Sequence, residues 1–369
     1  MRRLIVLQLL PALASGGVER TTLEVAEALV RAGHRSIVVS AGGRLVAELE
    51  AAGSEHIALD IGRKSLASLR HAAALRRLFQ RLQPDIVHAR SRLPAWLAWL
   101  ALKRDRPSGL HFVTSVHGLN SPGTYSGILT RGERVICVSP SVREHVLRHW
   151  PQTDPARLAI IEPGIDPAVF YRDSAGATAP NALAAALASP RAPGERLLLM
   201  PGRGTRLKGH AAGLVLLAGL RDAGVGARLW LLGTREPGRE TYVRELENLA
   251  QRLGVAERVR IDPPSHEVAA AYRHSDLVLQ LSAKPEAFGR TVLEALAVGR
   301  PVVGWAHGGV GDLLSRYFPD GRVAPDDAAG LLATTLRVLA EFRPPPRIWP
   351  QTLATMQAQT LEVYESLAS

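Results

Sequence analysis

Residues 280–305 read Gln280-Leu-Ser-Ala-Lys-Pro-Glu-Ala-Phe-Gly-Arg-Thr-Val-Leu-Glu-Ala-Leu-Ala-Val-Gly-Arg-Pro-Val-Val-Gly-Trp305. An apolar run at 277–281 precedes a loop that contains proline and glycine. A helix-like segment follows at 290–298, and a second apolar run covers 301–304. Short apolar runs on either side of a helical segment are typical of the strand, helix, strand unit of a parallel sheet. The stretch therefore predicts an α/β fold.

Two carboxylates fall inside this unit. Glu286 lies in the loop, and Glu294 lies about one turn into the helix. The backbone N–H groups of Phe288, Gly289 and Arg290 lie at the start of the helix, where unpaired donors and the helix dipole favour an anion. Taken alone, Glu286 could cap the helix and Glu294 could be a solvated acid. Together they favour a ligand that carries both hydroxyls and phosphates.

The spacing of the motif adds a family resemblance. The pattern Pro-Glu-x-Phe-Gly-x(4)-Glu-Ala-x-Ala-x-Gly-x-Pro-Val-Val resembles the carboxylate motif of retaining GT-B glycosyltransferases of the family-4 type, and more closely the lipopolysaccharide and surface-glycan group. The resemblance implies two Rossmann-like domains that face each other across a cleft, and a nucleotide-sugar donor, with UDP-sugar favoured. It also implies that Glu286 contacts sugar hydroxyls, that Glu294 contacts the ribose, and that Phe288, Gly289, Arg290 and Thr291 lie beside the diphosphate.

A second motif, Gly-Arg-x(4)-Lys-Gly, covers 202–209 and contains Arg203 and Lys208. Both cations stand between a predicted strand and a predicted helix, where they can meet a diphosphate. In open sequence they would be ordinary surface charges. The motif resembles the donor-phosphate motif of the same family. Neither a dinucleotide-binding glycine motif nor a P-loop is found, which argues against those two classes.

The first half offers three weaker candidates. Gly16 and Gly17 form a turn between a predicted strand at 4–10 and a predicted helix, and His117 follows another strand. A glycine pair can be an ordinary turn, and a histidine after a strand is usually a satisfied polar residue. The resemblance nevertheless implies that Gly16 and Gly17 approach the donor phosphate and that His117 contacts the donor sugar.

Composition sets the domain plan. A chain of 369 residues is long enough for two domains, with 46% hydrophobic and 21% charged residues as in globular proteins. The predicted plan is an acceptor domain at 1–172, a linker rich in Ala, Pro and Ser at 173–195, and a nucleotide-sugar domain at 196–349. The family resemblance implies that a final helix, within 350–369, returns to the first domain.

The net charge of +11 calls for an anionic partner. Most of the excess lies in residues 1–170, which hold 22 Lys and Arg against 14 Asp and Glu. With 5% aromatic residues and no zinc-finger spacing, nucleic acid is not an expected partner. An anionic membrane surface or a phosphate-bearing acceptor fits better. The single cysteine, Cys137, excludes an intramolecular disulfide and fits a reducing compartment.

The location of the protein follows from similar reasoning. Residues 1–14 superficially match a secretory signal, but Gln8 and Pro11 interrupt the apolar run, and a first strand is the favoured interpretation. No segment is apolar enough to cross a bilayer. The expected location is the cytoplasm, and the cytoplasmic face of the inner membrane is the alternative. A basic helix at 63–83 and the neighbouring Trp96 and Trp99 could contact that surface or could simply cover the sheet.

The predicted reaction is sugar transfer with retention of anomeric configuration and without a metal ion or other cofactor. Arg203, Lys208 and the helix start would stabilise the charge on the departing diphosphate. Two alternatives stay open. A glycoside hydrolase also uses two carboxylates, but it needs no cations beside them. A non-catalytic membrane or nucleic-acid binding protein could share the fold.

Overall fold

The computed structural model describes residues 2–14, 16–63, 68–171, 192–265, 267–341 and 351–369. The chain forms two compact units, one of residues 1–164 with 351–369 and the other of residues 165–350. Most of the predicted linker at 173–195 lies outside the described residues.

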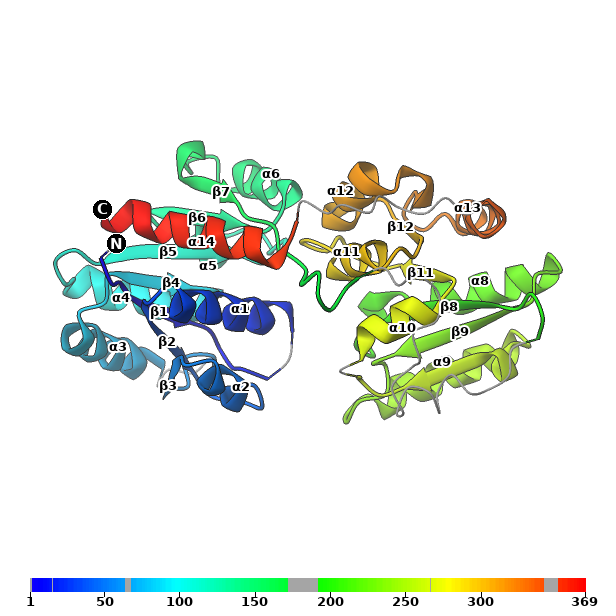
Figure 1. The fold of residues 1–369 in the computed structure, drawn as a ribbon, viewed down its shortest axis with the longest axis horizontal. Helices are drawn as coiled ribbons and strands as arrows, with labels where there is room; N and C mark the ends of the chain where they lie inside the picture. The colour runs from blue at the N-terminus through cyan, green and yellow to red at the C-terminus, as the bar shows by residue number, and fades with distance from the viewer. Residues whose placement is uncertain (1, 15, 64–67, 172–191, 266, 342–350) are drawn as a thin grey trace. The chain divides into compact units, whose positions relative to one another are not determined.

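The first unit has seven parallel strands in the order β3-β2-β1-β4-β5-β6-β7 over its described residues (Figure 1). Its strands are β1 (Ile5–Leu9), β2 (Arg35–Ser40), β3 (Glu55–Ala58), β4 (Ile86–Ala89), β5 (His111–Val116), β6 (Arg134–Cys137) and β7 (Leu158–Ile160). Its helices are α1 (Gly17–Arg31), α2 (Val46–Ala51), α3 (Ser68–Leu82), α4 (Arg92–Arg104), α5 (Thr124–Gly127), α6 (Pro140–His149) and α14 (Leu353–Ala368). The central strands β1, β2 and β4 are buried along almost their whole length, as expected where helices cover both faces of a parallel sheet.

The second unit repeats this arrangement with six described strands in the order β10-β9-β8-β11-β12-β13. Its strands are β8 (Arg196–Pro201), β9 (Ala227–Leu232), β10 (Val259–Asp262), β11 (Leu277–Gln280), β12 (Val302–Trp305) and β13 (Arg322–Val323). Its helices are α8 (His210–Asp222), α9 (Glu240–Arg252), α10 (Val268–His274), α11 (Arg290–Ala297), α12 (Gly308–Tyr317) and α13 (Ala328–Ala340). The predicted α/β class with two Rossmann-like domains is confirmed.

The last helix belongs to the first unit. Helix α14 (red in Figure 1) packs on α1, and its Met356 and Tyr364 are buried in the same core as residues of α1, β1, β4, β5 and β6. The hydroxyl of Tyr364 lies 2.6 Å from Nδ1 of the fully buried His88. Hydrophobic burial and this polar contact together fix the helix on the sheet.

The strand order places one switch point in each sheet, where two neighbouring strands lead to helices on opposite faces. In such sheets ligands bind beyond the carboxyl ends of those two strands. The switch point lies between β1 and β4 in the first unit and between β8 and β11 in the second. None of the helices in the described parts of the chain is long and apolar enough to span a bilayer.

Candidate functional site

The switch point of the second unit brings the two sequence motifs together. Because β8 and β11 are parallel neighbours, the loops that follow them leave the same edge of the sheet. Lys208 stands at the end of one loop and Glu286 in the other, and Lys208 Nζ lies 2.6 Å from Glu286 Oε1. Both side chains remain about one-quarter exposed, so a ligand can still reach them.

A close backbone contact between the two loops sets this distance. Gly209 has φ of 73°, and a Cβ atom at this position would lie 1.8 Å from the carbonyl oxygen of Leu281. The N–H of Ala283 donates to the carbonyl of Leu207 at 2.9 Å. Only glycine permits this approach, which explains why the motif ends in Lys208-Gly209.

The loop that carries Glu286 is held from two further sides. The hydroxyl of Ser282 donates a hydrogen bond to the same Oε1 atom that Lys208 contacts. At the start of α12, the N–H of Gly309 donates to the carbonyl of Glu286 at 2.8 Å, and His307 Nε2 lies 3.0 Å from the carbonyl oxygen of Ser282. The carboxylate is therefore positioned before any ligand binds, as a binding site requires.

Helix α11 begins at this loop, as the sequence predicts. Gly289 is its N-cap residue with φ of 115°, no side chain caps the helix, and no acid lies in its first turn. Phe288 is buried and anchors the turn. Arg290 and Thr291 open the helix, so its backbone donors and positive dipole end face the loop. The start of α11 can accommodate an anion beside Lys208.

Glu294 lies one turn further along α11 and has partners at both oxygens. The hydroxyl of Tyr272 donates to Oε2 at 3.0 Å, and Arg290 Nε lies 3.5 Å from Oε1. Tyr272 is buried, and burial followed by the charge of Glu294 raises the pKa of its hydroxyl well above the usual value. The hydroxyl therefore stays protonated and donates to Glu294.

Arg203 is a predicted phosphate-binding cation, but it forms no ion pair with Glu286 or Glu294. Its side chain is exposed, and its guanidinium makes no hydrogen bond or ion pair within the described residues. Its carbonyl accepts a hydrogen bond from Thr205, in the same loop that leads to Lys208. The structure thus pairs Lys208 with Glu286 and Arg290 with Glu294, and it leaves Arg203 at the rim of the same loop.

The predicted residues of the first unit lie at its own sheet edge. Gly16 is the N-cap of α1 with φ of 144°, and Gly17 is the first helical residue. His117 directly follows β5, and its Nε2 atom is buried without a partner among the described residues. Burial, and then the charge of Arg90, lowers the pKa of His117 to about 3, so its imidazole is neutral near pH 7.

Several residues of both sites carry no recognisable signal in the sequence. Ser282 lies three residues before the first position of the motif, and Tyr272 meets Glu294 only through the packing of α10 on α11. Arg90 was not singled out, although an arginine after a buried strand could have been. In the described residues, no three His, Cys, Asp or Glu side chains are grouped to hold a metal ion. Metal independence stays a prediction.

His210 begins α8 and allows a test of the electrostatics. It is 1% exposed, with Nδ1 3.2 Å from the Tyr242 hydroxyl and Nε2 3.2 Å from Thr234 Oγ1. Burial, and then the charge of Lys208, lowers the pKa of His210 to about 4. An unfolded histidine binds its proton near pH 6.5. Between these values the unfolded state holds more protons, so the second unit loses stability as the pH falls.

We expect the loss to begin below pH 6.5 and to approach about 1.4 kcal/mol per pH unit until about pH 4. We measure the free energy of unfolding in urea at pH 7 and at pH 5. Between these values it should fall by about 2 kcal/mol less in His210→Asn than in the wild type. His149→Asn, at an exposed position, is the matched control. An unchanged pH dependence in His210→Asn would contradict the assigned environment.

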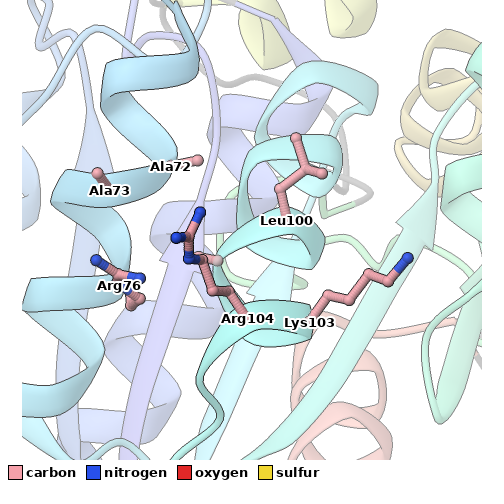
Figure 2. A pocket seen from close by; sticks show the side chains of 7 residues that line it. Ala72, Ala73, Arg76, Leu100, Lys103 and Arg104 are labelled. Carbon is pink, nitrogen blue, oxygen red and sulfur yellow. The ribbon is translucent and has the colours of Figure 1, made fainter.

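A separate groove lies between α3 and α4 in the first unit. Figure 2 shows Ala72, Ala73 and Arg76 from α3, and Leu100, Lys103 and Arg104 from α4. The groove measures about 600 Å³. Leu100 is 36% exposed and contributes apolar surface to the groove. Apolar surface rimmed by cations is typical of contact with an anionic interface.

Two family models match the chain. The model described as "Glycosyltransferase Family 4" matches residues 15–169, and the model described as "Glycosyl transferases group 1" matches residues 187–347. A D-inositol 3-phosphate glycosyltransferase of Xylanimonas cellulosilytica is 34% identical over 243 residues, which cover 61% of this chain and 56% of that protein. The chain spans little more than half the length of the first curated relatives it matches, 56% and 59%.

Solved structures share the fold. The crystal structure of a glycosyltransferase from Rickettsia africae ESF-5 has a TM-score of 0.83 and 27% sequence identity, covering 100% of this chain and 99% of that one. Anabaena HepE in complex with UDP-glucose has a TM-score of 0.77 and 19% identity, covering 99% of this chain and 100% of that one. At such low identity, the second likeness concerns the fold alone.

Proposed function

The chain belongs to the GT-B glycosyltransferases, with a family 4 domain followed by a group 1 domain, and on this premise we propose that it transfers a sugar from a nucleotide-diphosphate sugar to a hydroxyl acceptor. We favour a UDP-sugar as donor and a glycan or lipid-linked acceptor of the lipopolysaccharide type. The observation that carries the proposal is the contact between Lys208 and Glu286 at the start of α11, where a diphosphate and a sugar hydroxyl can be held together.

The proposed roles follow from charge and position. Lys208, Arg203 and the backbone donors at the start of α11 stabilise the negative charge that grows on the diphosphate as its bond to the sugar breaks. Glu286 accepts hydrogen bonds from sugar hydroxyls, and Glu294 accepts them from the ribose. Two cations and a helix start can supply the charge that a metal ion supplies elsewhere, so we propose that the reaction needs no metal.

In the proposed reaction, the first unit binds the acceptor. It also provides a contact to the donor sugar. Gly16 and Gly17 leave room for the donor phosphate at the start of α1, and neutral His117 accepts a hydrogen bond from a sugar hydroxyl. The acceptor oxygen bonds to the anomeric carbon on the face from which the diphosphate leaves, and the proton of the acceptor hydroxyl passes to the departing diphosphate oxygen, so the configuration is retained. No carboxylate of the chain is assigned as a nucleophile.

A thermal-shift screen of the full chain tests donor binding. We expect UDP and UDP-sugars to raise the melting temperature, and GDP and ADP to raise it less, because a ligand that binds only the folded state stabilises it by RT ln(1 + [L]/Kd), about 2.7 kcal/mol at a hundredfold excess over Kd. EDTA should leave the shift unchanged. If no nucleoside diphosphate raises the melting temperature, the proposed function is wrong.

We further propose peripheral contact with an anionic membrane at the cytoplasmic face, through the groove between α3 and α4. Exposed Leu100 can enter the headgroup region while Lys103 and Arg104 contact phosphates (Figure 2). Beside the groove, Lys103 lies 5.2 Å from the ring centre of Trp99, which forms an edge-to-face pair with Trp96. Aromatic rings next to cations are favoured at membrane interfaces.

Vesicle co-sedimentation tests this contact. We expect binding to vesicles with phosphatidylglycerol and little binding to pure phosphatidylcholine. Each basic residue near an anionic surface contributes about 1 kcal/mol, so reversing Lys103 and Arg104 to Glu should weaken binding at least about 30-fold. Reversing Arg244 and Arg252, exposed on α9, changes the net charge equally and serves as the control. If the two double variants weakened vesicle binding equally, the groove between α3 and α4 would not be the membrane-binding face.

A further inference from the structure

The switch point of the first unit holds a buried arginine that the proposed mechanism does not use. Arg90 directly follows β4, at the carboxyl edge where β4 pairs with β1. This is the first unit's counterpart of the edge where Lys208 and Glu286 meet, and a ligand is expected there on topology alone. Arg90 is 3% exposed. A cation is rarely buried to this extent unless it has a partner.

Part of the Arg90 guanidinium has such a partner. Its Nε donates to Gln8 Oε1 at 2.7 Å, and Gln8 Nε2 donates to the carbonyl of Thr22 at 3.2 Å. The amide of Gln8 is thereby held with its oxygen toward Arg90. The Nη2 atom of Arg90 is buried and has no hydrogen-bond partner among the described residues. A buried donor of a charged group that has no hydrogen-bond partner destabilises the folded protein, and a ligand oxygen would relieve this cost.

A second unpartnered polar atom lines the same cavity. His117, whose Nε2 atom is buried and unpartnered, lines the same cavity of about 10 Å³ as Arg90, together with Thr21, Ser115 and Thr360. The neighbouring His88 is fully engaged, with Nδ1 2.6 Å from the Tyr364 hydroxyl and Nε2 2.5 Å from Ser115 Oγ. This wall of the cavity is therefore fixed, and the two residues with an unpartnered buried nitrogen, Arg90 and His117, line the same small space.

The chemistry of the cavity selects its ligand. The polar part of its described lining contains one guanidinium, two imidazoles and three hydroxyl groups, and no carboxylate; the rest of the lining is apolar. Burial lowers the pKa of Arg90. Burial, and then the charge of Arg90, lowers the pKa of His117, so His117 is neutral and Arg90 is the only cation of the two. A volume of about 10 Å³ admits one oxygen atom and not a whole sugar. Arginine binds phosphate and carboxylate oxygens in preference to neutral ones.

We propose that Arg90 and His117 bind one negatively charged oxygen of the acceptor, from a phosphate or a carboxylate group. This subsite rests on the proposed function, because it names the acceptor as anionic. Nε2 of His117 donates to the anion together with Nη2 of Arg90, which leaves Nδ1 of the neutral imidazole as the acceptor for a sugar hydroxyl. The subsite selects acceptors that carry a negative group near the reacting hydroxyl.

The test uses the full chain labelled with ¹⁵N-histidine, with inorganic phosphate and acetate as probes at matched ionic strength. The His117 signal, assigned with a His117→Gln variant, should move on titration. If only phosphate moves the His117 signal, the subsite is selective for a phosphate group. If both phosphate and acetate move it, the subsite accepts either kind of oxyanion. If neither probe moves the His117 signal, the subsite is refuted, and this holds even if Arg90 variants do not fold.

Variants locate the binding. Arg90→Gln should weaken the affinity for the probe at least tenfold, and Arg90→Lys should weaken it less. Arg77→Gln, at an exposed position on α3, should leave this affinity unchanged. Lys208→Ala should also leave it unchanged, which separates this subsite from phosphate bound at the second unit. Undiminished probe binding in Arg90→Gln would show that Arg90 does not hold the anion, and the proposed subsite would be wrong. UDP binding by the same wild-type sample reports on the proposed function separately, since Lys208 and the start of α11, which are proposed to hold the diphosphate, lie on other loops.

Discussion

Lys208→Ala is expected to lower kcat by about 10²- to 10³-fold, the loss usually found when one preorganised group that stabilises transition-state charge is removed. Lys208 is the one cation whose position is fixed from two sides, by Gly209 against the Leu281 carbonyl and by Glu286. Turnover is measured as release of nucleoside diphosphate that depends on acceptor. The melting temperature should fall by only a few degrees, because a partly exposed ion pair contributes about 1 kcal/mol or less.

The matched control for this experiment is Lys284→Ala. Lys284 is exposed in the same loop as Glu286, so its removal changes the local charge without touching the paired site. It should retain nearly full activity. Normal turnover in Lys208→Ala with a normal melting temperature would remove Lys208 from the mechanism.

Glu286→Gln is expected to lower kcat/KM by about 10²-fold, since the variant keeps the shape of the side chain and removes its charge. Two effects act together. The sugar hydroxyls lose a charged acceptor, and Lys208 loses the carboxylate that holds its Nζ 2.6 Å away. Affinity for the free nucleoside diphosphate should change less than threefold, because that ligand lacks the transferred sugar whose hydroxyls Glu286 contacts.

Glu257→Gln, at an exposed position, controls for the general loss of one negative charge. A different pattern would point to a different role. If Glu286→Gln weakened the binding of the nucleoside diphosphate as strongly as the binding of the nucleotide sugar, Glu286 would act by orienting Lys208 and not by binding the transferred sugar.

The second unit's site could largely be predicted from the sequence. Gly209, Gly289 and the two glutamates stand at fixed spacings, because each spacing reflects one local turn: a close loop contact, a helix start, and one helical turn. The approach of Lys208 to Glu286, 78 residues later, additionally requires that β8 and β11 be neighbours. Only the family resemblance supplied that information, because no local pattern encodes strand order.

The residues that support these groups could not be predicted in the same way. Tyr272 reaches Glu294 through helix packing, and Tyr364 reaches His88 across 276 positions. Such contacts depend on which helix covers which strand, and the sequence around each partner looks like ordinary core. Arg90 is similar, since its burial becomes evident only when Gln8 on β1 is seen to lie beside β4.

The most direct test of the central claim is a calorimetric titration of the nucleoside diphosphate that the thermal-shift screen selects, compared with its monophosphate. If Lys208 and the start of α11 hold the diphosphate, the wild type should bind the diphosphate at least tenfold more tightly than the monophosphate, and Lys208→Ala should abolish most of that difference. Equal affinities in the wild type, or a difference that survives in Lys208→Ala, would contradict the assignment of this site.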